Sequence, residues 1–293
     1  MGGPCRAGRI TYVAAQTQGD QRTLCIQPLT MQQLLCLLLL LPLAIQALPF
    51  AISQDLWQLR ELPTSHRSAR HPALLAVQYF NYQAGSPSSL LSLHQVIKAK
   101  VKSVPEIGKK YYVDFTAKSL KNPEEVSLCS ASVFFHLENP RPAIKVDCPA
   151  NTIQALDDDY NFYKKIKQRS TPLNGQEIPD GHGYVAPDLV PVWNLAELAS
   201  SYVMWDKSTE DLEYSLQQIK NFKQVMRKDD LIAFDYDVLL HEIPYQEMVF
   251  CHIHVVWIPG KLPKVEYHCS HDSDENGSGS KSEEGSSSLG NFK

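Results

Sequence analysis

CSASVFFHLENPRPAIKVDC (residues 129–148) and CHIHVVWIPGKLPKVEYHC (residues 251–269) are the two stretches that decide the fold of this chain. Each begins and ends with a cysteine and has a proline-containing turn near its middle. On both sides of the turn, apolar residues occupy alternate positions, which is typical of a strand with one buried face. The sequence therefore predicts two β-hairpins of one design, which we interpret as parts of an internal repeat.

The cysteines predict how each hairpin is closed. Every second residue from Cys129 to Leu137 is apolar and shares one face, and the residues before Cys148 alternate in the same way. Both cysteines then point to the buried face and lie across from each other, within reach of an S–S bond. Cys251 and Cys269 occupy the same places in the second hairpin, so two disulfides are expected.

The second hairpin also offers a metal-binding alternative, because His252, His254 and His268 lie close to two cysteines. Structural zinc sites usually cluster their ligands in short Cys-x-x-Cys or His-x(3–5)-His steps. A His-x-His step on a strand instead places both rings on the same face, here the solvent face. We therefore expect a disulfide with surface histidines, and neither a metal site nor a cofactor.

A matching set of elements precedes each hairpin. Apolar residues at helical spacing, with proline and glycine at the ends, predict one helix in each half. Period-two alternation predicts long strands after it, and the strand at 213–227 is assigned by analogy with the first half. Each half is therefore expected to be one helix that covers four antiparallel strands, an α+β fold. The predicted helices are 72–83 and 191–206, and the long strands are 90–104, 111–118, 213–227 and 231–243.

A third helix is predicted between the two halves, at 156–169. Three consecutive aspartates (157–159) stand at its expected start, and four basic residues lie between 164 and 169 at its end. This order of charges complements the helix dipole.

The N-terminal region indicates export. Residues 34–47 read LLCLLLLLPLAIQA, an uncharged run too short to span a bilayer comfortably but suited to the apolar region of a signal peptide. Cleavage after Ala47 would leave a secreted chain, and Met31, just before the run, is a candidate true start. An uncleaved signal anchor, giving a single-pass membrane protein, is the alternative.

Composition and motifs divide the chain into six predicted segments. They are a leader with signal peptide (1–47), a flexible N-terminal segment (48–70), a first unit (71–148), a linker with its helix (149–190), a second unit (191–269) and a disordered, acidic, serine-rich tail (270–293).

Charge and motifs exclude several function classes. A formal net charge of -4 with scattered lysines provides no basic face for nucleic acid. His241-Glu242 is not followed by the second histidine of a metalloprotease helix. The mature cysteines are expected to be oxidised, which leaves no thiol nucleophile. The sequence therefore indicates a binding protein that is not an enzyme.

Five motifs, in order along the chain, carry a resemblance to a known family. They are AVQYFNYQAGSP (76–87), YNFYKKIKQ (160–168), IPDGHG (178–183), SSYVMWDKSTED (200–211) and RKDDLIAFDYDVLLHEIPYQE (227–247). Together with the paired cysteines, the signal peptide and the long tail, they resemble the secreted branch of the latexin family. The resemblance implies two tandem cystatin-like units joined by a linker helix.

The same resemblance implies inhibition of A-type zinc metallocarboxypeptidases, which makes a metallocarboxypeptidase the expected protein partner. In the family, the inhibitory surface lies at the junction of the units and includes the loop between two long strands of the second unit. Gln246-Glu247 match the Gln-Glu pair of that loop, whereas Pro244 and Tyr245 replace small residues. An ordinary hairpin turn is the alternative interpretation. The inhibitory-loop candidates are His241, Glu242, Pro244, Tyr245, Gln246 and Glu247.

The tail suggests a second function. Residues 270–293 are too polar to fold, and Asn276 is an N-glycosylation candidate. Ser273 and Ser282 are phosphorylation candidates, because an acidic residue follows each of them two positions later. Phosphates there would add negative charge that could hold calcium. The alternative to inhibition is thus an extracellular-matrix or calcium-mineral protein, and the simplest interpretation of the tail is a solvated spacer.

Overall fold

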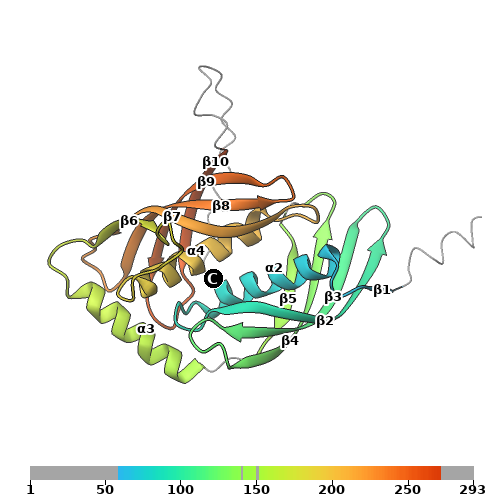
Figure 1. The fold of residues 1–293 in the computed structure, drawn as a ribbon, viewed down its shortest axis with the longest axis horizontal. Helices are drawn as coiled ribbons and strands as arrows, with labels where there is room; N and C mark the ends of the chain where they lie inside the picture. The colour runs from blue at the N-terminus through green and yellow to red at the C-terminus, as the bar shows by residue number, and fades with distance from the viewer. Residues whose placement is uncertain (1–58, 140, 150–151, 272–293) are drawn as a thin grey trace, which may run out of the picture. The chain divides into compact units, whose positions relative to one another are not determined.

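The structure, a computed structural model, describes residues 59–139, 141–149 and 152–271. Within these residues the chain is a mixed α+β protein with three helices and two antiparallel sheets, which fits a cystatin-like fold (Figure 1). None of the described helices has the length and apolar character that a membrane span requires. The predicted leader and the candidates Ser273, Asn276 and Ser282 lie outside the described residues.

The first half forms one sheet and one helix. Its five strands are hydrogen-bonded in sequence order, and every neighbouring pair is antiparallel. Helix α2 packs on this sheet, mostly against its second strand. The elements are β1 (Arg60–Leu62), α2 (Arg67–Ala84), β2 (Leu91–Val104), β3 (Gly108–Ser119), β4 (Val126–His136) and β5 (Ala143–Asp147).

The second half repeats this order of elements. Its strands are again paired in sequence order and antiparallel, and helix α4 packs on the sheet. The strand predicted by analogy at 213–227 is confirmed as β7. The elements are β6 (Asn174–Ile178), α4 (Val190–Lys207), β7 (Glu213–Val225), β8 (Ile232–Ile243), β9 (Glu247–Trp257) and β10 (Lys264–His271).

The prediction of four strands in each half is wrong by one, because each described sheet has five. Strand β1 lies in the segment predicted to be flexible and pairs with β2, and β6 lies in the predicted linker and pairs with β7. Both are short edge strands, REL and NGQEI, which bury few side chains. They therefore lack the apolar alternation that identifies a strand in the sequence.

Two smaller predictions also need correction. Helix α3 (Thr152–Lys167) begins one turn earlier than expected, so residues 157–159 are not in its first turn, although three lysines do occupy its last turn. Strand alternation predicts Leu137 on the buried face, but this residue follows the end of β4 and is 72% exposed. The chain has already turned there, and strand alternation no longer applies.

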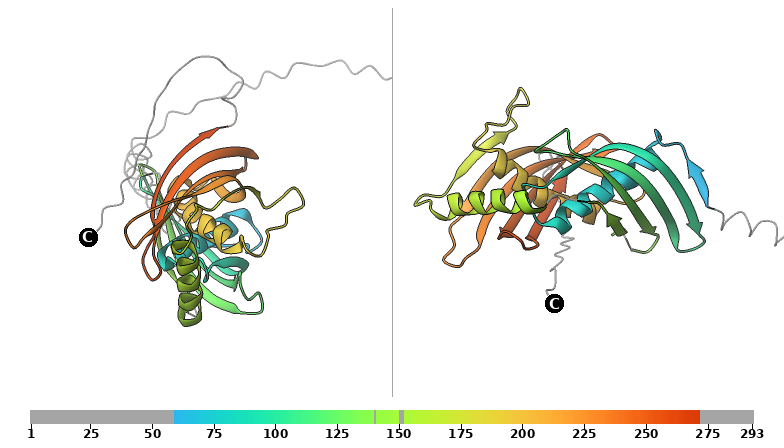
Figure 2. Two further views of the ribbon diagram at one scale, coloured as in Figure 1. Left: turned by 90° about the vertical axis from the view of Figure 1, so that its left-hand side faces the viewer. Right: turned by 90° about the horizontal axis from the view of Figure 1, so that it is seen from below.

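Two apolar cores lie between the helices and their sheets. In both halves the sheet curves around its helix (Figure 2), and α2 and α4 also pack against each other. Phe115 and Val133 are fully buried in the first core, as Phe234 and Leu195 are in the second. Trp205 of α4 packs against both cores, so the two helix–sheet layers share one continuous apolar contact.

The expected disulfides are confirmed. Cys129 is bonded to Cys148, and Cys251 to Cys269. In the second hairpin the two cysteines are register partners across β9 and β10. In the first, Ser130 pairs with Asp147 at the end of the ladder, which leaves the cysteines opposite each other one step further on.

Candidate functional site

The candidate loop connects β8 to β9 at one end of the second sheet. Pro244, Tyr245, Gln246 and Glu247 are exposed, and the Tyr245 side chain has 66% of its surface free. The backbone N–H of Gln246 donates a 2.9 Å hydrogen bond to the backbone carbonyl oxygen of Glu242, which closes the turn. Gln246 has a φ of 62°, a left-handed conformation that is uncommon for a residue with a side chain. The loop thus presents four consecutive exposed residues, 244–247, on a tight turn.

Glu242, near the end of β8, anchors the start of the loop to the second sheet. Of the six candidate residues it is the one that the structure buries, with only 5% of its surface exposed. Its Oε2 accepts a hydrogen bond of 2.6 Å from the hydroxyl group of Tyr214 on β7. Burial, and then this bond and the carboxylate charge, raise the pKa of Tyr214 above its ordinary value. The phenol therefore stays a hydrogen-bond donor at any physiological pH.

Arg67 joins the base of the loop to the first half of the chain. It lies in the first turn of α2, and its Nη2 donates to the carbonyl oxygen of Asp211 at 2.6 Å and to that of Ile243 at 3.3 Å. Ile243 is the last residue of β8, directly before the exposed turn. The guanidinium thus connects α2, the segment after α4 and the candidate loop.

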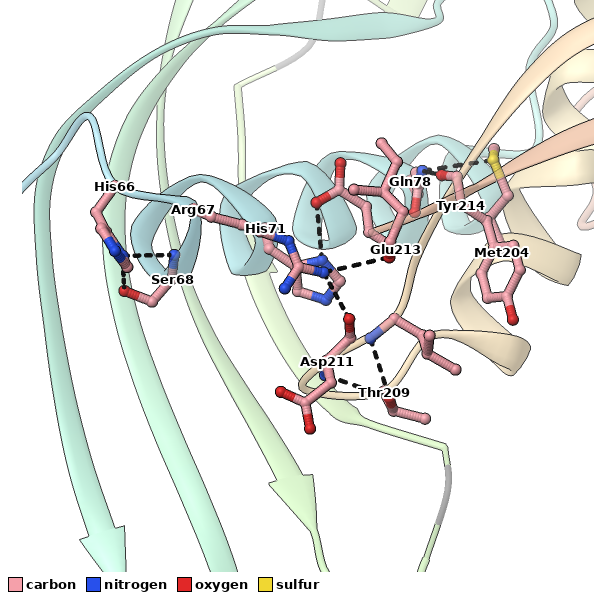
Figure 3. A network of polar contacts seen from close by, with 12 residues as sticks. His66, Arg67, Ser68, His71, Gln78, Met204, Thr209, Asp211, Glu213 and Tyr214 are labelled. Carbon is pink, nitrogen blue, oxygen red and sulfur yellow. Dashed lines mark hydrogen bonds and ion pairs between the residues drawn. The ribbon is translucent and has the colours of Figure 1, made fainter. Parts of the chain in front are cut away.

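A second polar contact lies one turn further along α2. His71 is 2% exposed, and its Nδ1 lies 2.9 Å from Oε2 of Glu213 at the start of β7 (Figure 3). Burial on its own would raise the pKa of Glu213. The hydrogen bond and charge of His71, with the charges of Arg67 and Arg70, instead hold that pKa below its ordinary value of 4.5.

Gln78 completes this row of contacts on α2. Its Nε2 donates to the carbonyl oxygen of Tyr214 at 2.9 Å and reaches Sδ of Met204 at 3.5 Å. Figure 3 shows Arg67, His71 and Gln78 along α2 facing the start of β7. The helix predicted at 72–83 begins five residues earlier, at Arg67, so Arg67 and His71 lie outside the predicted element. Gln78 lies inside it, but a single polar residue on a helix is indistinguishable from an ordinary solvent-facing one. None of the three is therefore identified as a candidate by the sequence alone.

The start of β3 also contacts the segment after α4. Glu210 Oε1 accepts from Lys109 Nζ at 2.7 Å and from the Tyr111 hydroxyl at 2.8 Å. Burial, followed by the hydrogen bond and charge of Glu210, raises the pKa of Tyr111 above its ordinary value. We call the region made by the N-terminal turn of α2, residues 210–213, the start of β3 and the β8–β9 loop the junction surface.

Two of the three histidines of the second hairpin pair with aspartates on the neighbouring strand β8. His252 Nδ1 lies 2.9 Å from Oδ1 of Asp237, and His254 Nδ1 lies 2.6 Å from Oδ1 of Asp235. Among the residues that the structure describes, no three His, Cys, Asp or Glu side chains are grouped so that they could hold a metal ion. The two rings lie on the face of the sheet opposite the disulfide.

Comparison with known proteins gives the family. The sequence profile described as Latexin matches residues 62–275. Retinoic acid receptor responder protein 1 of Homo sapiens is 41% identical over 241 residues, which cover 77% of this chain and 81% of that protein. Ovocalyxin-32 of Gallus gallus is 39% identical over 225 residues, which cover 75% of this chain and 82% of that protein. Latexin of Homo sapiens is 33% identical over 211 residues, which cover 71% of this chain and 95% of that protein. The chain therefore belongs to the latexin family.

Proposed function

We propose that this protein is a secreted, non-catalytic inhibitor of A-type zinc metallocarboxypeptidases that acts through the β8–β9 loop. In this proposal the halves are two tandem cystatin-like units (71–148 and 191–269) joined by the linker 149–190. Membership of the latexin family supports an inhibitory role. The observation that carries the proposal is an exposed loop tip, Tyr245-Gln246, whose flanking residues Glu242 and Ile243 are hydrogen-bonded to both halves of the chain.

A rigid tip suits the task of blocking a cleft. A flexible loop loses conformational freedom when it binds, whereas a loop already fixed in its bound shape avoids much of that cost. Here Arg67 bonds the carbonyl group of Ile243, and Tyr214 bonds the buried Glu242. The exposed residues are therefore presented by a base with little freedom to move, and Tyr245 offers a large amphipathic contact area.

The test is inhibition of a panel of A-type and B-type metallocarboxypeptidases by the purified secreted chain. The variants are Tyr245→Ala, Gln246→Ala and the Gln246→Ala, Glu247→Ala double variant. Tyr184→Ala is the matched control, because Tyr184 is also an exposed loop tyrosine (60%) but lies in the segment before α4.

We expect inhibition in the submicromolar range, weakened about tenfold or more by each loop variant and unchanged by the control. Absence of inhibition at roughly tens of micromolar, equivalent to less than about 7 kcal/mol of binding, would contradict the proposal. Equal loss in Tyr184→Ala would show that the β8–β9 loop is not the inhibitory site.

The composition of the tail favours a second function, in the extracellular matrix or on calcium mineral. Residues 270–293 combine serines with Asp and Glu and include Ser273, Ser282 and Asn276 as modification candidates. Phosphorylation would strengthen the negative charge of this segment. Ser270 and His271, predicted to belong to the disordered tail, instead end strand β10 and pair with β9. Removing residues 272–293, which leaves β10 intact, is therefore expected to abolish adsorption to calcium phosphate or carbonate without changing inhibition. If the truncated chain adsorbs equally well, the tail is not responsible for mineral binding.

A further inference from the structure

The outer face of the first sheet is rich in lysine. Along its strands, residues of the apolar core alternate with residues that point away from α2, so the sheet has a buried face and an outer face. In β2, for example, Ala99 and Val101 lie in the core, and the residues on either side of them are lysines. The lysines of the outer face are Lys98, Lys100, Lys102, Lys110, Lys118 and Lys145.

Four of these lysines lie in two neighbouring rows that cross the sheet from β2 to β5. The first row consists of Lys100, Tyr112, Ser132 and Lys145, and the second of Lys102, Lys110, Phe134 and Ala143. We call the four lysines of these rows the lysine cluster. Lys102 and Lys110 are directly opposite each other, an arrangement in which like charges repel. An anion bound over the two rows would offset this repulsion.

The carboxylates on the outer face of the described strands are fewer than the lysines. Asp114 and Asp147 lie in the adjacent row, with Lys98. Glu61 of β1 is opposite Lys100, and its Oε1 lies 3.3 Å from Nζ, but its side chain is 75% exposed, so this ion pair is weak. The face therefore carries net positive charge, although the whole chain has a formal net charge of -4. Strand pairing brings these lysines together, so spacing in the sequence does not reveal the face.

A hollow of about 480 Å³ lies on this face. The volume is within the range of about 300–1,000 Å³ that is typical of ligand sites. Its polar lining consists of Lys98, Lys100, Tyr112, Asp114, Ser130, Ser132, Lys145 and Asp147. The Tyr112 side chain is 39% exposed, and Nζ of Lys110 lies 5.4 Å from the centre of its ring. The hollow is separate from the junction surface, because Lys109 and Tyr111, which contact Glu210, point to the opposite face of β3.

We propose that the hollow and the lysine cluster bind a sulfated polysaccharide of the heparin class. Sulfate groups accept charge-assisted hydrogen bonds from lysine ammonium groups. Sugar hydroxyl groups can donate to Asp114 and Asp147, and a sugar ring can pack on the amphipathic ring of Tyr112. The run KAKVK (98–102) is lysine-rich in the manner of heparin-binding patches. The backbone of double-stranded DNA offers only acceptors, so the two aspartates disfavour it.

The first experiment compares three polyanions by isothermal titration calorimetry with the full secreted chain. They are a heparin dodecasaccharide, the same oligosaccharide without its sulfate groups, and double-stranded DNA of equal charge. We expect a micromolar dissociation constant for heparin at about 50 mM salt, weakened about tenfold or more at about 200 mM because binding releases counterions. The other two ligands should bind at least about tenfold more weakly than heparin.

Two outcomes of this experiment would contradict the proposal. Absence of heparin binding at about 100 μM ligand and about 50 mM salt would overturn the site. Binding of DNA or of the desulfated oligosaccharide as tight as that of heparin would overturn the assignment to a sulfated sugar.

The double variant Lys110→Gln, Lys145→Gln tests the lysine cluster. It removes two charges and leaves long polar side chains on the outer face, away from the core. We expect heparin affinity to fall about tenfold or more at about 50 mM salt, with a weaker salt dependence because fewer counterions are released. Lys164→Gln, Lys165→Gln is the matched control, since it removes two charges from exposed lysines of α3. Equal losses in both variants would show that net charge, and not this face, is responsible for binding.

Tyr112→Ser tests the hollow without changing any charge. We expect heparin affinity to fall about three- to fivefold, by the same factor at about 50 mM and about 200 mM salt, because contact with the ring is not ionic. Tyr160→Ser is the control, because Tyr160 is a tyrosine of similar exposure (42%) on α3. Unchanged affinity in Tyr112→Ser, or an equal loss in Tyr160→Ser, would contradict the location of the sugar in the hollow.

Discussion

The indole N–H of Trp257 donates a 2.7 Å hydrogen bond to the carbonyl oxygen of Gly85. Gly85 is the C-cap of α2 in the first half, whereas Trp257 ends β9 in the second. A Cβ on Gly85 would lie 2.7 Å from the carbonyl oxygen of Lys261 in the β9–β10 turn. The end of α2 is therefore built against the second sheet, 172 residues away in the chain.

This contact predicts that Gly85→Ala destabilises the protein. Gly85 has a φ of 66°, where a side chain costs about 1 kcal/mol or more, and its Cβ would also collide with the turn. We expect a loss of about 2–3 kcal/mol in the free energy of unfolding, measured by urea denaturation. Gly181→Ala is the control, because its Cβ would meet nothing within 4 Å. Equal stability of the two variants would contradict the close approach at Gly85.

The His71–Glu213 contact predicts a loss of stability in acid. The pKa of Glu213 is lowered on folding, so its stabilising effect is complete above its ordinary value of 4.5 and is lost as the pH falls through the lower folded-state value. Glu213→Gln should therefore lower the free energy of unfolding by about 1–3 kcal/mol at pH 7, and by much less at about pH 3. Thermal unfolding at both pH values provides the measurement.

The exposed Glu124 provides the control for this experiment. Glu124→Gln should leave stability within about 0.5 kcal/mol of the unmodified protein at both pH values. If Glu213→Gln lowered the free energy of unfolding as much at about pH 3 as at pH 7, the ionised carboxylate would not be what stabilises the contact.

Tyr214→Phe is expected to loosen the candidate loop. The variant removes the hydroxyl group that bonds Glu242, and leaves a carboxylate with 5% exposure without that donor. The free energy of unfolding should fall by about 1–3 kcal/mol. If the proposed inhibition is correct, it should weaken by about tenfold, because a mobile loop has more freedom to lose on binding. Tyr184→Phe, which removes an exposed hydroxyl group, should change neither quantity.

The sequence was sufficient to predict the long elements and the disulfides. The hairpins between Cys129 and Cys148 and between Cys251 and Cys269 are marked by alternation over many residues, and helix α4 by a long apolar run. Edge strands β1 and β6 were missed because their stability comes from main-chain pairing, which leaves no side-chain pattern.

The site was only partly predictable for a related reason. The β8–β9 loop could be located from motifs, but the groups that support it come from distant parts of the chain. Arg67 and Ile243 are separated by 176 residues, and Tyr214 and Glu242 by 28. Tyr214 and Glu242 meet as register partners across β7 and β8. Arg67 meets Ile243 because the first turn of α2 lies against the end of β8, and a sequence pattern, which records local spacing, does not show such a contact.

Glu197 of α4 predicts a pH dependence opposite to that of Glu213. The residue keeps a partly exposed edge, yet burial of its carboxyl group raises its pKa from 4.5 to about 7. An acid with a raised pKa binds more protons when folded, so stability falls as the pH rises from about 4.5 to about 7. Glu197→Gln cannot ionise and should remove this decline. Because the edge is partly exposed, we expect a gain of only about 1 kcal/mol at pH 8, and no gain near pH 4. Urea denaturation at the two pH values, with Glu124→Gln as the control, measures the difference. If Glu197→Gln raised the free energy of unfolding by the same amount at both pH values, the gain would come from better packing. Ionisation of Glu197 would then be ruled out as its cause.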